Sequence, residues 1–201
     1  MSTLKSIETL DDIAYDNPAR QLLDCDRCAF VAVDLQEKLV PKMFNREPLI
    51  SNSRLLLRLA HIMSLPVLAT TQYAKGLGPA VPEIAELLGD AQPHDKVYFS
   101  AFGAESFCTE LQNYNKRNTL LICGVETHVC VMQTAINALN QGYTVYIAAD
   151  AVGSRTEANW RAGLERMKDA GVVMSTTEMM IFELLRRSDS AMFKEILQHL
   201  K

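Results

Sequence analysis

The sequence lacks an apolar run long enough to cross a membrane, which takes about 18 consecutive residues. Its first 20 residues also have no apolar core, and they carry four acidic side chains, Glu8, Asp11, Asp12 and Asp16. This composition differs from that of an ordinary secretory signal or a transit peptide. We therefore expect no membrane span and a cytoplasmic location.

An excess of positive charge is also missing. The chain has 20 Lys and Arg against 24 Asp and Glu, which gives a formal net charge of −4, and like charges do not form blocks. Binding to nucleic acid usually requires a clustered basic surface. The composition therefore gives no electrostatic reason to expect a nucleic acid as partner.

Cysteine and histidine are too few, and too unevenly spaced, for a recognisable metal or redox motif. The chain has five cysteines and four histidines. Cys25 and Cys28 form a Cys-x-x-Cys pair, but a zinc site would need two more ligands at suitable spacing. A thioredoxin-like pair follows a strand and opens a helix, whereas this pair precedes the first predicted strand. Packing is the simplest interpretation of both residues.

Glycine-rich phosphate loops are absent as well. A dinucleotide site places Gly-x-Gly-x-x-Gly after the first strand. At that position this chain reads Asp34-Leu-Gln-Glu-Lys-Leu, and no Gly-Lys-Ser/Thr sequence occurs anywhere. We expect no nucleotide cofactor, and no other cofactor is indicated.

The chain does contain a regular alternation of strand-like and helix-like segments. Short apolar runs, several of them apolar enough to be covered on both faces of a sheet, predict strands at 30–35, 66–72, 96–100, 120–125, 144–149 and 172–176. Helical spacing predicts helices at 49–63, 81–88, 104–116, 128–141 and 157–170, then two more beyond residue 178 with a break near Ser188.

This alternation predicts an α/β fold, a three-layer α/β/α sandwich. Its six-stranded parallel sheet should have the order 3-2-1-4-5-6. A single domain over 1–201, with a core at about 27–183 and a helical tail at 184–201, suits the length. The apolar stripe of the tail could pack on its own domain or on a second subunit.

The segment from Thr119 to Cys130 carries the most chemical information. Its apolar run ends at Gly124, and from His128 onward apolar residues recur at helical spacing. Cys130 is thereby placed in the first helical turn, where unpaired backbone N–H groups favour a thiolate. A thiolate at a strand-to-helix turn is a candidate nucleophile. An inert buried cysteine is the alternative.

Two more polar residues flank predicted strands. Asp34 ends the first strand, which neighbours the strand before Cys130 in the predicted order, so its carboxylate could exchange a proton with the thiol. Lys96 opens the third predicted strand, where its charge needs solvent or a negative partner. A loop cap for Asp34 and an exposed strand-edge position for Lys96 are the alternatives.

A series of short motifs surrounds these three residues. In chain order they are Val33-Asp-Leu-Gln36, Thr70-Thr-Gln-Tyr73, Lys96 with Phe99-Ser-Ala-Phe102, Gly124-Val-Glu-Thr-His-Val-Cys130, Gln133-Thr-Ala135, Gly142-Tyr143 and Asp150-Ala151. In this order and spacing, the chain from about residue 27 to about residue 183 resembles the isochorismatase-like cysteine hydrolases. The resemblance is greatest to the isochorismatase domain-containing branch.

The resemblance implies an Asp–Lys–Cys catalytic triad made by Asp34, Lys96 and Cys130. It also implies a cis peptide bond between Val125 and Glu126. This bond is expected to aim the Glu126 amide beside the Cys130 amide, so that the two form an oxyanion hole.

Candidate pocket residues come from the same motifs. Tyr73, Phe99 and Phe102 are possible walls, with ordinary core packing as the alternative. Thr127 matches the family threonine of the cis turn and is expected to hold that turn by hydrogen bonds. His128 is a candidate pocket residue; it is a poor candidate for the base, because helical residues two apart face different ways.

Departures from related families narrow the chemistry. Metal-binding nicotinamidases carry an Asp-x-His pattern after the second strand, where this chain reads Thr71-Gln-Tyr-Ala-Lys, so we expect no metal. True isochorismatases cleave a vinyl ether and typically lack the nucleophilic cysteine. Cys130 therefore indicates amide-like or other acyl substrates.

Together these features predict a metal-free hydrolase of a small amide, imide or related carbonyl compound. It would act on carbon–nitrogen bonds other than peptide bonds, through a thioester on Cys130. An isochorismatase-type enzyme without a covalent step is one alternative, and a non-catalytic binding or assembly protein is another. We expect a small-molecule substrate, no nucleic acid or membrane partner, and a homo-oligomer.

Overall fold

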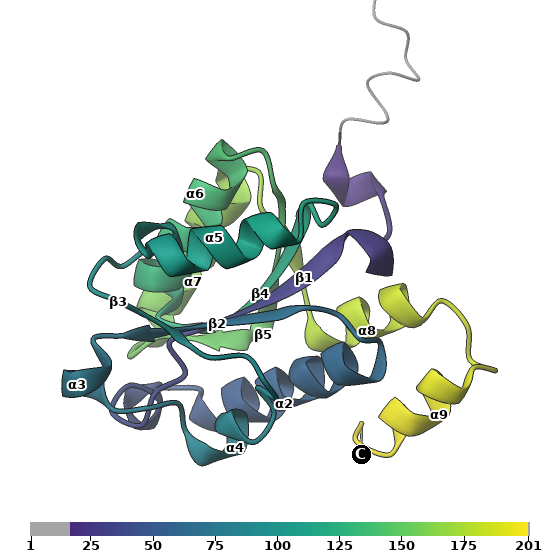
Figure 1. Ribbon diagram of the computed structural model, residues 1–201, viewed down its shortest axis with the longest axis horizontal. Coiled ribbons are helices and arrows are strands. Elements are labelled where there is room, and N and C mark those ends of the chain that lie inside the picture. The colour runs from purple at the N-terminus through teal and green to yellow at the C-terminus, as the bar shows by residue number, and fades with distance from the viewer. Residues whose placement is uncertain (1–16, 201) are drawn as a thin grey trace, which may run out of the picture.

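A six-stranded parallel β-sheet forms the centre of the molecule, with helices on both faces (Figure 1). The structure is a computed structural model that describes residues 17–200. The strands are β1 (Cys28–Val33), β2 (Val67–Gln72), β3 (His94–Lys96), β4 (Thr119–Val125), β5 (Thr144–Gly153) and β6 (Val173–Ser175). Their order, β3-β2-β1-β4-β5-β6, confirms the topology predicted from the sequence.

Two groups of helices cover the sheet. One face carries α5 (Glu105–Asn113), α6 (Met132–Asn140) and α7 (Glu157–Asp169), and the other carries α2 (Arg46–Ile62), α4 (Pro82–Ala85), α8 (Thr177–Leu185) and α9 (Ala191–Leu197). Shorter elements are α3 (Ala74–Leu77), a π-helix (Thr127–Val131) and 3-10 helices at Pro18–Arg20, Cys25–Arg27, Val40–Lys42 and Ala101–Gly103. Strand β1 supplies both cores, because successive side chains point to opposite faces: Phe30 enters one cluster and Val31 the other.

The C-terminal helices pack on their own domain. Met180 and Ile181 of α8 and Ile196 of α9 are fully buried in the same apolar cluster as Leu56 and Leu57 of α2. The predicted break in the tail lies between α8 and α9, while the expected core boundary at 184 falls inside α8. The sequence left open whether the apolar stripe of the tail packs on its own domain or on a second subunit. In this structure it packs on its own domain.

The third strand differs most from its prediction. A strand was expected at 96–100, but β3 ends at Lys96, whose partner Gln72 is the last residue of β2. Without a neighbouring strand to pair with, the apolar residues that follow form no strand, and Val97, Tyr98 and Phe99 are 72%, 65% and 52% exposed. Lys96 therefore lies at the carboxyl end of its strand.

Other element boundaries also differ. The helix expected at 81–88 is regular only over α4, and the helix expected at 128–141 begins as a π-helix before continuing as α6. Strand β5 continues four residues beyond its predicted end at 149, because a register shift between Ile122 and Gly124 lets Val125 pair with Gly153. The end of β5 therefore runs beside the turn that follows β4.

Gly124 makes the close contact between β1 and β4 possible. Its φ is +122°, and a Cβ atom at this position would lie 2.0 Å from the carbonyl oxygen of Val33. No side chain fits there, and an L-residue rarely adopts such a backbone conformation. Glycine at this point lets the ends of the two strands approach each other directly before Asp34 and Glu126.

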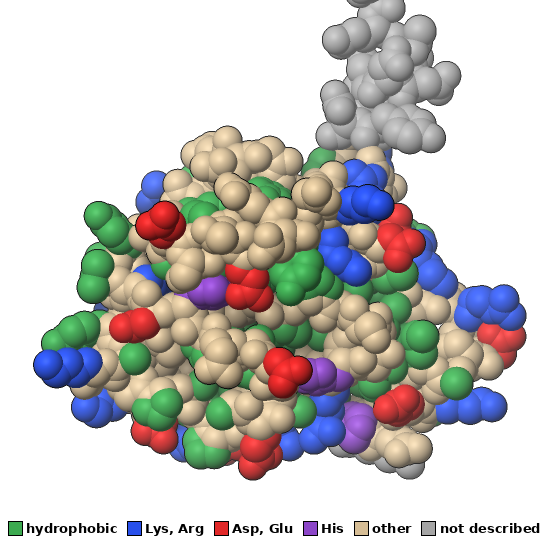
Figure 2. All heavy atoms as spheres, in the orientation of Figure 1, with side chains coloured by type: hydrophobic (Ala, Val, Ile, Leu, Met, Phe, Trp, Pro, Cys, Tyr) green, Lys and Arg blue, Asp and Glu red, His purple; other side chains and the backbone are tan. Residues whose placement is uncertain are grey.

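Among residues 17–200, no helix is both long and apolar enough to span a membrane. On the face drawn in Figure 2, basic and acidic side chains are interspersed, and neither sign gathers into a broad patch.

Candidate active site

The carboxyl ends of three strands bring the predicted triad residues to one edge of the sheet. Asp34 directly follows β1, Lys96 ends β3, and Cys130 lies in the π-helix after β4. Strand β1 lies between β2 and β4 in the sheet, and β3 lies beyond β2. All three residues are nearly inaccessible, with Asp34 0%, Lys96 3% and Cys130 6% exposed.

Asp34 and Lys96 form a buried ion pair. The Lys96 Nζ donates to Asp34 Oδ2 at 2.7 Å, and both side chains are 0% exposed. The other carboxylate oxygen, Oδ1, accepts a hydrogen bond from Thr70 Oγ1 at 2.7 Å. A buried ion pair is tolerated when its remaining hydrogen-bonding capacity is satisfied. The carboxylate is therefore held in a fixed orientation.

Gln72 gives Lys96 a second acceptor, a role that sequence reasoning missed. Its Oε1 accepts from Lys96 Nζ at 2.8 Å, and its Nε2 donates to the carbonyl of Val97 at 3.0 Å. The fully buried Gln36 holds the backbone of Gln72 in turn, through bonds of 2.7 Å and 3.1 Å to its N–H and carbonyl. Both glutamines lie in motifs that carried the family resemblance.

Cys130 rests as a protonated thiol. Burial and then the nearby negative charge of Asp34 raise the pKa of its thiol to about 12, outweighing the opposite effects of Lys96 and the Glu126 backbone. The thiolate expected at a helix start is therefore not the favoured form here. Cys130 lies in the π-helix, and the removal of water dominates. The thiol must therefore lose its proton when it reacts, and Asp34 lies close enough to interact with it.

The turn between β4 and the π-helix is closed by backbone hydrogen bonds. The peptide bond between Val125 and Glu126 is cis. The carbonyl of Glu126 accepts hydrogen bonds from Val129 N at 2.9 Å and Val131 N at 3.2 Å. An interaction with the Glu126 backbone lowers the pKa of Cys130, as an N–H group facing the sulfur does.

Thr127 and His128 have different surroundings. The Thr127 side chain is fully buried, and within residues 17–200 its hydroxyl has no hydrogen-bond partner, so the expectation that it holds the turn by hydrogen bonds is wrong. The His128 Nδ1 lies 3.0 Å from the Oγ of Ser154, which follows β5. Sequence reasoning gave no role to Ser154, since only the extension of β5 brings it here.

The three aromatic residues predicted to line the pocket differ in packing and exposure. Phe102 packs its ring against Phe107 at 5.5 Å and Tyr143 at 6.3 Å between ring centroids, which is core packing. Tyr73 and Phe99 are 50% and 52% exposed, and they follow the ends of β2 and β3. These two side chains flank the edge of the sheet that carries Asp34 and Lys96.

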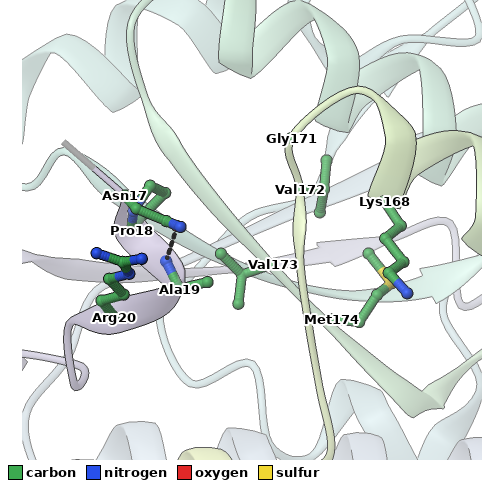
Figure 3. A pocket seen from close by; sticks show the side chains of 9 residues that line it. All are labelled: Asn17, Pro18, Ala19, Arg20, Lys168, Gly171, Val172, Val173 and Met174. Atoms are coloured by element: carbon green, nitrogen blue, oxygen red, sulfur yellow. Dashed lines mark hydrogen bonds between the residues drawn. The ribbon is translucent and has the colours of Figure 1, made fainter. Parts of the chain in front are cut away.

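A large hollow in the described part of the structure lies elsewhere. A cavity of about 800 Å³ opens where β6 begins, at the edge of the sheet opposite the triad (Figure 3). Its lining residues are Asn17, Pro18, Ala19, Arg20, Lys168, Gly171, Val172, Val173 and Met174. It contains none of the predicted site residues.

Two of the remaining cysteines, Cys28 and Cys123, are buried and do not form a second reactive site. All five cysteines are free thiols, and burial raises the pKa of Cys28 and of Cys123 to about 12. In the described part of the chain, one group of metal-ligating atoms lies close together, that of Asp24, Cys25 and Asp26. Both acidic residues of this group are exposed, and it lies before β1, far along the strand from Asp34.

We expect the alkylation of Cys130 to depend on pH in a way that follows this high pKa. The rate with iodoacetamide should rise about tenfold per pH unit from pH 7 to about pH 10, because only the thiolate reacts. Asp34→Asn removes a charge that raises the pKa, so Cys130 should alkylate faster in that variant. Peptide mapping after timed labelling measures both rates, with the partly exposed Cys25 as internal reference. A wild-type plateau below pH 8 contradicts this description.

The amino-acid sequence matches a known protein family and is similar to several known proteins. A family model named Isochorismatase domain matches residues 28–179. Isochorismatase domain-containing protein 2 of Danio rerio is 38% identical over 164 residues, which are 81% of each chain.

Solved structures give the same result for the fold. MAR1 ribonuclease from Caenorhabditis elegans has a TM-score of 0.82 at 33% identity, covering 90% of this chain and 92% of that one. YcaC from Pseudomonas aeruginosa, with hexane-2,5-diol and covalent acrylamide, has a TM-score of 0.83 at 29% identity over 89% and 91% of the chains. YcaC from Escherichia coli, an octameric hydrolase of unknown specificity, has a TM-score of 0.82 at 28% identity over 89% and 90%.

Proposed function

Because this chain belongs to the isochorismatase family and has a hydrolase fold of that family, we propose that it is a metal-free cysteine hydrolase. Its substrate class is a small amide, imide or related carbonyl compound. The observation that carries the proposal is the burial of a thiol, a carboxylate and an ammonium group together at the carboxyl ends of the strands. Buried, interacting groups of this kind are typical of catalytic sites.

In the first step, the Cys130 sulfur attacks the carbonyl carbon while the thiol proton moves to Asp34. The carbon–sulfur bond forms as the carbonyl π-electrons move to oxygen. The backbone N–H groups of Glu126 and Cys130 stabilise that oxyanion, a contribution typically worth about 3 kcal/mol per donor. A protonated resting thiol suits this step, because the proton is transferred only when the substrate is present.

In the second step, the tetrahedral intermediate collapses and the carbon–nitrogen bond breaks. Asp34 returns its proton to the leaving nitrogen, which leaves a thioester on Cys130. A water molecule then attacks the thioester, and Asp34 accepts a proton from it. Collapse of the second intermediate releases the acid and restores the thiol, with the proton returning from Asp34 to the sulfur.

Lys96 balances charge and fixes geometry in this scheme. Its ammonium group bonds to Asp34 Oδ2 and Gln72 Oε1, leaving the other carboxylate oxygen to Thr70. The negative charge that passes between sulfur, carboxylate and oxyanion therefore always has a positive partner nearby. An ammonium held at the end of β3 also disfavours a metal cation at the same place.

The structural neighbours support a reactive nucleophile. The P. aeruginosa YcaC structure contains covalent acrylamide, which shows that this neighbour forms a bond to a small amide-bearing compound. The E. coli YcaC is described as a hydrolase. Both observations agree with a cysteine that attacks electrophilic carbon.

Two other activities are less well supported. An isochorismatase-type reaction needs no thiol, and it leaves the contact of Cys130 with Asp34 without a role. The C. elegans neighbour is described as a ribonuclease. A net charge of −4, together with the charges interspersed on the face drawn in Figure 2, gives little reason to expect RNA binding in this chain.

The proposal is tested by screening small amides, imides and ureas with the wild-type protein and with Cys130→Ala. We expect release of ammonia or an amine by the wild type and none above background by the variant. A hydrolase that retains activity after Cys130→Ala would favour the isochorismatase-type reaction instead. A wild type that turns over no member of the panel, while Cys130 stays unreactive, would favour a non-catalytic role.

We expect the purified protein to contain no stoichiometric zinc, iron or manganese. The second-strand residues that carry metal ligands in nicotinamidases are replaced here, and Gln72 binds Lys96 instead. Elemental analysis of protein prepared without chelators measures the content. About one tightly bound metal per chain contradicts a metal-free mechanism.

We further propose that the protein is a cytoplasmic homo-oligomer. Val97, Tyr98 and Phe99 form an exposed apolar segment beside the site, and the E. coli neighbour is an octamer. Light scattering after gel filtration should give a mass that is a multiple of the 22.4 kDa chain. A single species at the mass of one chain contradicts this prediction.

A further inference from the structure

The turn that carries the oxyanion donor is held from outside by the two residues that follow β5. The side chain of Thr127, at the centre of the turn, makes no hydrogen bond to any residue in 17–200. Of the residues on either side of it, Glu126 is bonded to Arg155 and His128 to Ser154. The geometry points to Arg155 as a positioning residue for the oxyanion hole, with Ser154 as its support.

Arg155 binds the Glu126 side chain at two points. Its Nε donates to Glu126 Oε2 at 2.9 Å, and its backbone N–H donates to the same oxygen at 3.3 Å. The Glu126 side chain is only 14% exposed, whereas that of Arg155 is 58% exposed. A carboxylate anchored both by a backbone group and by a charged side chain can move little, so the peptide unit of Glu126 is fixed at one end.

Ser154 secures the opposite side of the turn. It is fully buried, its Oγ lies 3.0 Å from His128 Nδ1, and its carbonyl accepts from the backbone N–H of Phe44 at 3.0 Å. The pairing of Val125 with Gly153 brings these residues beside the turn. Arg155 thereby follows a fully buried residue at the end of β5.

Helix α7 closes the remaining side. A Cβ atom at Gly163 would lie 2.9 to 3.0 Å from backbone atoms of Thr127 and His128, so the helix and the turn are in direct backbone contact. With the sheet edge, α7 and the Ser154–Arg155 pair around it, the turn has one well-defined position. Oxyanion donors act through such preorganisation, and small displacements reduce their effect.

This role rests on the proposed function, and its test separates the two. We compare kcat and KM of Arg155→Ala, Glu126→Ala and Glu126→Gln on a substrate whose turnover requires Cys130. The first two variants should lose between about tenfold and a hundredfold in kcat, less than the 10²–10³-fold loss for outright removal of a donor. KM should change by less than about twofold, because the oxyanion-hole donors stabilise the transition state much more than the bound substrate.

Glu126→Gln serves as the conservative rescue. Its amide oxygen can still accept both bonds from Arg155, so kcat should stay within about threefold of wild type. Arg155→Ala introduced into Glu126→Ala should cause little further loss, because the two residues act through one contact. Arg161→Ala is the matched control, since it removes an arginine paired with Glu157 on α7, outside the turn.

Several outcomes overturn the assignment. Arg155→Ala with kcat within twofold of Arg161→Ala shows that the contact does not position the donor. A loss seen only in KM shows that Arg155 contacts the substrate instead. If kcat falls together with the melting temperature in both Arg155→Ala and Glu126→Gln, the role is structural. Absence of Cys130-dependent turnover in the wild type would refute the proposed function and this role with it.

Discussion

Replacement of Asp34 by Asn is expected to lower kcat/KM of the folded protein by at least about 10³-fold, and to lower stability because the buried Lys96 ammonium loses its charged partner. Asn is nearly the same size, and its single amide oxygen can accept from Lys96 while its NH2 group faces the hydroxyl of Thr70, but it cannot take the thiol proton or return it to the leaving group. Loss of a general acid–base group typically costs 10²–10⁴-fold, and here one carboxylate serves several proton transfers. Steady-state kinetics on a substrate found by screening measures the loss.

Two observations make this result interpretable. The exposed Asp90 provides a matched Asp→Asn control that should behave as wild type. Alkylation of Cys130 should accelerate in Asp34→Asn, because the nearby negative charge that raises the thiol pKa is gone. A variant that turns over poorly but alkylates readily has lost proton transfer and kept its nucleophile. Near-wild-type kcat/KM in Asp34→Asn contradicts the mechanism.

Replacement of Lys96 by Met is expected to damage both stability and activity. It leaves the carboxylate of Asp34 buried without its charged partner, a change that costs about 3–5 kcal/mol. For a chain of this size the melting temperature should fall by roughly 10 °C. Thermal unfolding followed by circular dichroism measures the loss, and Lys116→Met, at an exposed position, is the control.

A double variant separates charge from packing. Asp34→Asn combined with Lys96→Met removes both charges, so it should recover part of the stability lost in Lys96→Met alone. Lys96→Arg keeps the charge, but a planar guanidinium does not fit a fully buried ammonium site, and we expect a large loss of turnover. A Lys96→Met protein as stable as Lys116→Met contradicts the buried ion pair.

The strand order and the convergence of Asp34 and Cys130 follow from patterns visible in the sequence, whereas the place of Lys96 beside them came from the family resemblance. Continuous apolar runs mark buried parallel strands, and in such sheets polar residues at strand ends meet at one edge. Lys96 does lie against Asp34, but the strand predicted to begin at Lys96 instead ends there. Nothing in the apolar residues 97–99 indicates that β2 ends at Gln72 and leaves them unpaired.

Other features depend on three-dimensional packing and could not be derived from local patterns. The high thiol pKa of Cys130 reflects how completely water is excluded and how near Asp34 lies, which sequence spacing does not give. The contact between Arg155 and Glu126 depends on a register shift in the middle of β4 and β5. Thr127 matched a family position, yet its hydroxyl bonds to nothing in residues 17–200.

The central claim is that Cys130 forms a covalent thioester during turnover. Rapid quenching in acid followed by mass spectrometry of the intact protein and of the Cys130 peptide tests it directly, using an amide or activated ester that the wild type hydrolyses. The mechanism predicts a mass increase equal to the acyl group, located on Cys130 in the wild type and absent in Cys130→Ser. Turnover at an unchanged rate with no acyl adduct on Cys130 at any quench time would contradict it.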